Sequence, residues 1–389
     1  MSRRLVIFYT TPVFLWIALY AYMPYVAPLA EVLGADFRLI GIIAGAYGFT
    51  QMLLRFPLGI LSDKLQMRKA FIVLGLVFAA LSGFVVFFFQ SPASLLLSRA
   101  LAGVSVSSWV IFMILGASYY KREETTKAVG YLNSTNALGR MTAMLLAGFV
   151  AERMGLSYAF LLSGIAALIG FVLALGIEEK KPEANAKPPS IKDLLGVARN
   201  HQLLSASILA ILTQYIPFAT AFAFTPVVAT GLGATNMQLG LLGFVAMLPS
   251  LFISPLAGTL IPKKLGVKNS LVLSFVLAGL GAAAIPFSQS LWQVFVAQTV
   301  SNIGSTAMGL TLLMGLCIQD IPNERRGTAM GFFQAVYAFG MFMGPIGLGW
   351  ISFWLGLNVA FVFTGIIGLT GALLTLLFVS RGYLRYIRD

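Results

Sequence analysis

The chain has very few of the residues on which disulfides, metal centres and most enzymes depend. Its 389 residues include one cysteine, Cys317, and one histidine, His201. A single cysteine cannot form an internal disulfide, and Cys317 stands in an apolar run, so we interpret it as a small core residue. Only 10% of the residues are charged. Because soluble domains carry about 25% charged residues, the sequence excludes an ordinary soluble protein.

Acidic residues are especially scarce, with 13 Asp and Glu against 26 Lys and Arg. No Asp, Glu, His or Lys lies in the middle of a long apolar segment. An enzyme working within the membrane would need such residues beside a serine or as an acid pair, so we expect no enzymatic activity. A Gly-rich phosphate loop followed by Lys and Ser is also missing, which argues against direct use of ATP. We expect neither a metal site nor a cofactor.

What the chain does have is apolar length, since 59% of its residues are hydrophobic. A helix needs about 20 mostly apolar residues to cross a bilayer. Twelve segments meet this need: 5–30, 39–60, 70–89, 95–118, 128–151, 158–177, 203–226, 237–260, 270–287, 291–317, 328–351 and 358–379. We therefore predict an all-α membrane protein with twelve transmembrane helices.

The connection from Ile177 to Gln202 differs from the others because it is polar, Pro-rich and of mixed charge. This composition is typical of a linker, and it divides the segments six and six. We predict an N-terminal six-helix bundle at 1–177, a cytoplasmic linker at 178–202 and a C-terminal six-helix bundle at 203–389.

The basic residues lie almost entirely on one side of this arrangement. The N-terminus, the even-numbered connections and the C-terminal tail hold 21 of them, whereas the opposite connections hold only Arg38 and Arg153. Short loops rich in Lys and Arg stay in the cytoplasm, so we expect a cell-membrane protein with both termini inside. The net charge of +13 then needs no nucleic-acid partner. We expect a monomer in contact with the lipid bilayer and a small-molecule substrate.

The two halves also share an internal repeat. At a constant offset of 201 residues, glycines of the fifth segment match glycines of the eleventh. These pairs are Gly130 and Gly331, Gly139 and Gly340, and Gly148 and Gly349. At an offset of 199, the turn after Gly59 matches the turn after Gly258. A repeat of this size predicts two pseudo-symmetric bundles.

The turn after the second segment reads GILSDKLQMRK from Gly59 to Lys69. Together with Arg99 and Gly103 in the fourth segment and Gly344-Pro345 in the eleventh, it resembles the major facilitator superfamily. The resemblance covers nearly the whole chain and is closest to its twelve-span drug and metabolite exporters. The sequence departs from the pattern at Gln66, where glycine is usual.

This resemblance implies a carrier that alternates between two open states. It assigns a cytoplasmic latch to the signature turn, with Glu123, Glu124, Asp320 and Glu324 as possible partners of its bases. The latch residues would be Gly59, Asp63, Lys64, Arg68 and Lys69. Gly340, Gly344 and Pro345 would be conformational positions. The alternative is that these bases only fix the orientation of the chain.

Polar and aromatic residues within the spans suggest a candidate substrate site. Charged residues at membrane depth are energetically costly, so each is first considered a functional residue. Arg140 has Asn136 and Asn133 on the same helical face, four and seven residues earlier. The full set is Arg140, Arg99, Asn133, Asn136, Trp109, Tyr22, Gln214, Tyr215, Gln298, Asn302, Gln334 and Tyr337. The alternative for the uncharged members is hydrogen bonding between helices. Arg55 would support the latch or reach toward the headgroups.

With no acid in a span interior, the candidates for proton coupling are Glu31, Asp36 and Asp63, of which Glu31 is preferred. The alternatives are coupling through a substrate carboxylate beside an arginine, and a uniporter. We predict a secondary active transporter that exports a small organic molecule by alternating access, coupled to protons. Import or exchange of a small organic anion through Arg140 and Arg99 is the alternative. A lipid-transporting or sensor protein on the same fold remains a further alternative.

Overall fold

The computed structural model describes residues 3–65, 67–120, 125–179, 196, 199–322 and 325–378, without the side chains of residues 56, 60, 63, 125 and 126. Every regular element within these residues is a helix, which confirms the all-α prediction for this part of the chain. Most of the expected linker at 178–202 lies outside the described residues.

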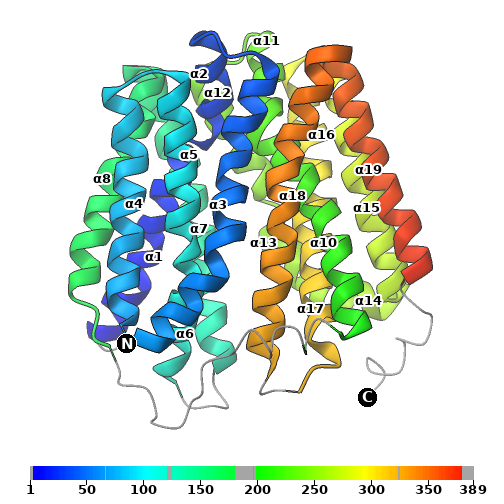
Figure 1. The fold of residues 1–389 in the computed structure, drawn as a ribbon. Coiled ribbons are helices and arrows are strands. Elements are labelled where there is room, and N and C mark those ends of the chain that lie inside the picture. Colours follow the sequence, from blue (N-terminus) through cyan, green and yellow to red (C-terminus); the bar gives the residue numbers. More distant parts are fainter. Residues whose placement is uncertain are drawn as a thin grey trace. The chain divides into compact units, whose positions relative to one another are not determined.

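In the first half, the helices follow the predicted segments closely (Figure 1). They are α1 (Arg3–Ala21), η1 (Met23–Tyr25), α2 (Val26–Val32), α3 (Phe37–Leu65), α4 (Arg68–Phe88), α5 (Pro92–Ser107), α6 (Trp109–Ser118), α7 (Thr125–Met154) and α8 (Leu156–Leu175). The first span is divided at η1 because Pro24 has no N–H to continue the helical hydrogen-bond pattern.

The second half repeats this order with more irregular helices. They are α10 (His201–Ala219), η3 (Thr220–Phe224), α11 (Thr225–Gly231), α12 (Asn236–Met247), α13 (Ser250–Gly258), α14 (Leu260–Leu265), α15 (Val267–Ala284), η4 (Ile285–Phe287), α16 (Leu291–Asn302), η5 (Ile303–Leu310), α17 (Thr311–Gln319), α18 (Arg326–Leu355) and α19 (Leu357–Phe378). Both η3 and η5 are π-helical, a form that is rare and common at functional sites.

Eleven segments of the described chain are long and apolar enough to cross a membrane. The predicted span at 128–151 is not among them, although the 30-residue helix α7 covers it. Its polar residues, Arg140 above all, lower its hydrophobicity. The helix that is least apolar by composition is therefore the one that carries the candidate site.

Contacts between helices repeat in the two halves. In the first half, α1 packs on α7 and α8, and α4 packs on α8 and α5; in the second, α10 packs on α18 and α19, and α15 packs on α19 and α16. Figure 1 shows α4 beside α5 and α15 beside α19. The same pairing supports the repeat found in the sequence.

By their contacts, the described residues form two units whose boundaries do not follow the predicted six-plus-six division throughout. Unit 1 holds the first half except Gly34–Gly48, and it gains Thr235–Leu241 from the start of α12. Unit 2 holds the rest, including Gly34–Gly48 from the start of α3. Each unit thus contains a helix beginning from the other half. We call the end of unit 1 where α3 meets α4, and the end of unit 2 where α14 meets α15, the basic end. The far end of each unit is called the opposite end.

Candidate functional site

The polar residues predicted on the fifth span lie along one edge of α7. Asn133 is exposed, and Asn136 and Arg140 are half-buried. Polar side chains within membrane spans are stable only where they meet other polar groups or water, because acyl chains offer no hydrogen bonds. We therefore interpret this edge of unit 1 as lining water rather than lipid.

Arg140 is held in place by an aromatic ring of α1. Its guanidinium carbon lies 4.3 Å from the centroid of the Tyr20 ring, and Tyr20 is buried. A cation over an aromatic face gains about 0.5–2 kcal/mol, more when water is excluded. A guanidinium fixed in this way presents planar N–H donors that match a carboxylate.

A glycine brings the two helices together at this point. A Cβ atom at Gly139 would lie 2.6 Å from the carbonyl oxygen of Val13 and 2.7 Å from Cβ of Trp16. Only a residue without a side chain allows α7 to approach α1 so closely. The neighbouring Arg140 is consequently within reach of Tyr20.

Two tryptophans extend the aromatic wall beside Tyr20. The ring centroids of Trp16 and Tyr20 are 5.7 Å apart, and those of Trp16 and Trp109 are 5.1 Å apart in an edge-to-face arrangement. Trp109 begins α6, where the fourth span is interrupted after α5. The indole N–H of Trp16 is buried and makes no hydrogen bond. Unit 1 thus combines a guanidinium, two amides and an aromatic surface.

Two other predicted residues of unit 1 are buried. Tyr22 is fully buried, stacks on Phe160 with ring centroids 4.7 Å apart, and its hydroxyl is 3.4 Å from Oγ of Ser82. This placement favours packing between α4 and α8 over substrate contact. Arg99 is also buried, within α5.

The predicted amides of the tenth span join helices of unit 2. Thr225 Oγ1 donates to Oε1 of Gln298 at 2.7 Å, and Nδ2 of Asn302 donates to the carbonyl oxygen of Ala246 at 3.0 Å. Both amides are buried. These bonds hold α16 to α11 and α12, so the packing alternative fits Gln298 and Asn302 better than substrate contact does.

The remaining predicted contacts of unit 2 come from α10 and α18. Gln214, Tyr215, Gln334 and Tyr337 are all buried. Tyr337 packs edge-on against Phe333 with ring centroids 5.4 Å apart. Tyr215 lies where α10 crosses α18, because a Cβ atom at Gly340 would be 3.0 Å from its backbone nitrogen.

The predicted conformational residues lie at close helix crossings of unit 2. A Cβ atom at Gly344 would lie 2.5 Å from the carbonyl oxygen of Tyr215, and one at Gly340 would overlap the carbonyl oxygen of Ile211. The carbonyl oxygen of Pro345 faces Gly41 of α3, 2.5 Å from the position of a Cβ there. Backbone therefore meets backbone on two sides of α18.

At the basic end of unit 1, the signature turn bonds to the end of α8. Glu179 accepts hydrogen bonds from the backbone N–H of Arg68 at 2.6 Å and of Lys69 at 3.3 Å, and so caps the N-terminus of α4. Lys69 Nζ donates to the carbonyl oxygen of Leu175 at 2.6 Å. Both contacts suit the partial charges at helix ends. Sequence reasoning missed Glu179, although two acids directly after an apolar span were a signal.

Other latch residues are less constrained or lie outside the described part. Lys64 is exposed, and the nearest side-chain atom to a Cβ at Gly59 would be Val110 Cγ1 at 3.8 Å. The side chain of Asp63 is outside the described residues, as are the acids Glu123, Glu124 and Glu324. Asp320 is exposed.

Acidic residues at the opposite end serve mainly as caps. Glu31 is exposed. Asp36 Oδ1 accepts from the backbone N–H of Leu39 at 2.9 Å and Oδ2 from Arg38 Nη2 at 2.7 Å. The hydrogen bond from Leu39 and the neighbouring guanidinium hold the pKa of Asp36 below its usual value. Asp36 is thus an ionised cap of α3.

Glu152 was not predicted as a site, but it makes a specific contact within unit 1. Its Oε2 accepts from the backbone N–H of Met237 at 3.0 Å, and Asn236 Nδ2 donates to the carbonyl oxygen of Ala151 at 3.0 Å. The carboxylate at the end of α7 therefore caps the start of α12. A solitary acid at a span end gave no sequence signal for this partner.

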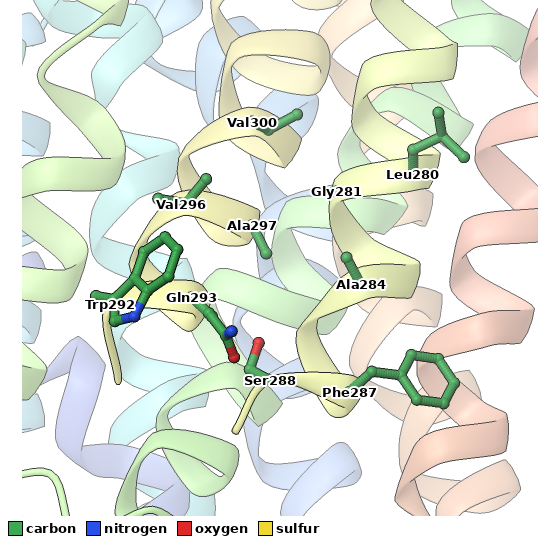
Figure 2. Close-up of a pocket in the computed structure, with 10 residues that line it drawn as sticks. All are labelled: Leu280, Gly281, Ala284, Phe287, Ser288, Trp292, Gln293, Val296, Ala297 and Val300. Carbon is green, nitrogen blue, oxygen red and sulfur yellow. The ribbon is translucent and has the colours of Figure 1, made fainter. Parts of the chain in front are cut away.

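A shallow groove of about 430 Å³ lies between α15 and α16 in unit 2. In Figure 2, Trp292 and Phe287 flank the polar side chains of Gln293 and Ser288. Both aromatic residues are largely exposed. Aromatic residues of this kind gather at membrane–water interfaces, and none of the predicted site residues lines the groove.

Comparison with known proteins places this architecture in a family. The sequence profile of the Major Facilitator Superfamily matches residues 9–230 and again residues 206–386. The chain belongs to this superfamily. Its two profile matches correspond to the two halves of the repeat, and the twelve-helix fold predicted from the sequence is confirmed.

Similar proteins include transporters of several kinds. An uncharacterised MFS-type transporter of Methanocaldococcus jannaschii is 24% identical over 92% of this chain and 93% of its own length. A proton-coupled antiporter flippase of Staphylococcus saprophyticus is 24% identical over 80% of this chain and 78% of its own. The crystal structure of the nucleoside transporter NupG superposes with a TM-score of 0.75 at 15% identity, over 97% of this chain and 99% of that chain. At this identity, the structure is evidence of fold alone.

Proposed function

We propose that this member of the superfamily is a secondary active transporter that exports a small organic molecule by alternating access, coupled to protons. The observation that carries this proposal is the partly exposed polar edge of α7 from Asn133 to Arg140. A membrane-spanning helix with such an edge is suited to a polar solute. The staphylococcal relative is a proton-coupled antiporter flippase, and this similarity supports coupled export.

Substrate contact in unit 1 is assigned to Arg140, Asn133 and Asn136, with Trp109 in the apolar wall. Gln214, Tyr215, Gln334 and Tyr337 are the corresponding candidates of unit 2. Most ligand sites are apolar pockets with a few placed polar groups, and these residues supply both. Tyr22, Gln298 and Asn302 are assigned to packing instead.

The basic end is proposed to face the cytoplasm, because it carries most of the Lys and Arg. Asp63 and Lys64 are the proposed latch at this end. The side chain of Lys69 anchors the end of α8, and the backbone N–H groups of Arg68 and Lys69 tie the start of α4 to Glu179. Glu31, exposed at the opposite end, is the proposed proton site. The protein is proposed to act as a monomer in the cell membrane.

Import or exchange of a small organic anion is the second candidate. This candidate is favoured by the positive charge of the spans. Among the described residues, every charged side chain that is buried is an arginine. Arg140 over Tyr20 would then bind a substrate carboxylate. Both candidates use the same polar edge.

Transport by purified protein in liposomes tests the proposal. A panel of organic cations, anions and neutral molecules is supplied with and without a pH gradient, and protein-free liposomes serve as the control. Saturable flux that depends on the gradient is expected for one class. Flux that is equal with and without protein for every class would contradict the proposed transport; saturable flux that ignores the gradient would contradict proton coupling alone.

A further inference from the structure

The groove between α15 and α16 is polar at one end and apolar at the other. Ser288 and Gln293 line it beside the short connection between two candidate membrane spans, at the opposite end of unit 2. Leu280 and Val300 line it about two turns further along the two helices. The groove therefore begins at the depth of the membrane–water interface and extends toward the acyl chains.

The two helices meet backbone to backbone at the apolar end of the groove. A Cβ atom at Gly281 would lie 2.5 Å from the backbone nitrogen of Ser301 and 2.8 Å from the carbonyl oxygen of Ala297. Ser301 Oγ also donates to the carbonyl oxygen of Ala278 at 3.1 Å. A helix is about 10–12 Å wide, so it cannot enter between helices that meet in this way. A single hydrocarbon chain can lie in the furrow between them.

The internal repeat shows which residues open the groove. Four of its lining residues are smaller than their partners 199 residues earlier: Gly281 against Ser82, Ala284 against Val85, Val296 against Leu97 and Val300 against Leu101. Trp292, in contrast, is much larger than its partner Ala93. These differences remove side-chain volume from the middle of the groove and add an aromatic ring at its rim.

Charge limits what could occupy this groove. No Asp, Glu, Lys or Arg occurs in the sequence from Asn269 to Gln319, which includes every residue that lines the groove. A charged ligand buried there would have no counter-charge, and such burial is strongly unfavourable. The expected occupant is therefore an apolar chain, and any polar contact that it makes must use neutral hydrogen-bonding groups.

Gln293 supplies such a group at the polar end. Its Oε1 atom accepts from the backbone N–H of Gln289 at 2.7 Å, and this bond fixes the orientation of the amide. Among the described residues, nothing accepts from its Nε2 atom. Figure 2 shows the side chain of Gln293 next to Ser288, between the rings of Trp292 and Phe287. An amide donor is thus available at the interface, directly above an apolar furrow.

We propose that the groove between α15 and α16 binds one acyl chain of a membrane glycerophospholipid, whose ester carbonyl accepts a hydrogen bond from the amide of Gln293. The chain lies over Ala284 and Ala297, and the exposed rings of Trp292 and Phe287 cover it from the two sides. The volume of about 430 Å³ is within the range of small-ligand sites, about 300–1,000 Å³. The site selects a lipid by its ester linkage and is indifferent to the charge of its headgroup.

This lipid site uses none of the residues proposed for substrate contact, and it does not depend on which substrate is transported. Binding of the lipid is measured without substrate and without a pH gradient. The proposed transport and the lipid site can therefore fail independently.

The test is native mass spectrometry of the delipidated full-length protein in detergent, titrated with dipalmitoyl phosphatidylcholine or with its diether analogue. The analogue has the same headgroup and chain length but no ester carbonyl. The wild type should bind one diester molecule about three- to tenfold more tightly than one diether molecule, because only the diester can accept the hydrogen bond from Gln293.

Two substitutions separate the chain contact from the ester contact. Ala284→Phe fills the groove and should abolish tight binding of the diester, whereas Ala93→Phe, at an exposed alanine of α5, should bind it like the wild type. Gln293→Glu keeps an acceptor for the N–H of Gln289 and removes the amide donor. This variant should bind the diester and the diether equally.

Equal binding of the two lipids by the wild type, or tight diester binding that persists in Ala284→Phe, would overturn the proposal. A dimer that the wild type forms and Ala284→Phe loses would assign the groove to a second copy of the chain and would also overturn it. If Ala284→Phe does not fold, Gln293→Glu decides the matter, because an undiminished preference for the diester in this variant would exclude the ester contact.

Discussion

Lys69 and Lys268 occupy repeat-related positions and make the same hydrogen bond. Lys69 Nζ donates to the carbonyl oxygen of Leu175 at 2.6 Å, and Lys268 Nζ donates to that of Leu376 at 2.7 Å. Each lysine thereby satisfies an unpaired carbonyl in the last turn of a helix, where a positive charge is favoured. A pair conserved between halves that share so little sequence indicates a static anchor.

Replacing either lysine with methionine should therefore lower stability without slowing transport per folded molecule. Loss of each bond should cost about 0.5–1.5 kcal/mol, and the two losses should add because the sites lie in different units. Thermal unfolding and transport of Lys69→Met, Lys268→Met and the double variant provide the check. If transport by Lys69→Met falls by more than the loss of folded protein, Lys69 acts in the latch and the static-anchor interpretation is wrong.

The glycines of the repeat should differ sharply in their tolerance of alanine. Gly340→Ala would push a Cβ atom into the backbone of α10 and should cost about 1–3 kcal/mol. Gly331→Ala, two and a half turns earlier on α18, meets nothing within 4 Å and should gain about 0.5–1 kcal/mol of helix stability. Unfolding temperatures of the two variants, compared side by side, test this. Equal effects would show that the crossing of α10 and α18 is looser than described.

The spans could be predicted from the sequence because each is a run of about 20 mostly apolar residues. The breaks within the spans were harder to predict. Pro24 explains the division at η1, but the π-helical segments η3 and η5 depend on packing that no local pattern encodes. A helix does cover the predicted span at 128–151, although α7 is not among the segments that are apolar enough by composition to cross a membrane.

The candidate site was only partly predictable, because residue type does not show which way a side chain points. Periodicity placed Asn133, Asn136 and Arg140 on one edge of α7. It could not show that Gln298 accepts a hydrogen bond from Thr225, or that Asn302 donates one to the carbonyl oxygen of Ala246.

Contacts that depend on partners far away in sequence were likewise missed. Glu179 caps α4 from the beginning of the linker, and Glu152 caps α12 from the end of α7. Each joins segments that are distant in the chain. Only the three-dimensional structure brings such acids to their helix ends.

Asp36 should make stability depend on pH at the acidic end of the range. Its pKa is lowered by the N–H of Leu39 and by Arg38, so its stabilising contribution is present above the unfolded-state pKa of about 3.9. That contribution is lost as pH falls through the lower folded-state pKa. Unfolding temperatures of wild type and Asp36→Asn should differ at pH 7 and converge toward pH 3. A difference that is the same at both pH values would contradict this cap.

Arg140 separates the two proposed substrate classes. If the substrate is an organic anion, Arg140→Gln should abolish transport, and Arg140→Lys should restore only part of it because a lysine cannot donate in a plane. Tyr20→Leu should weaken binding by about 0.5–2 kcal/mol through loss of the cation–π contact. A transporter of hydrophobic cations should be nearly indifferent to all three. Liposome flux of the variants, normalised to folded protein, gives the answer.

The polar edge of α7 can be tested directly with single cysteines. Cys317 is buried, so a Cys317→Ala background removes the native thiol, and Asn133→Cys and Leu138→Cys are then introduced separately. Leu138 is 58% exposed on the other side of α7 and serves as the lipid-facing control. If the edge from Asn133 to Arg140 lines a water-filled path, a membrane-impermeant thiol reagent should modify Asn133→Cys and leave Leu138→Cys intact. Modification of neither, or of both at the same rate, would contradict the account.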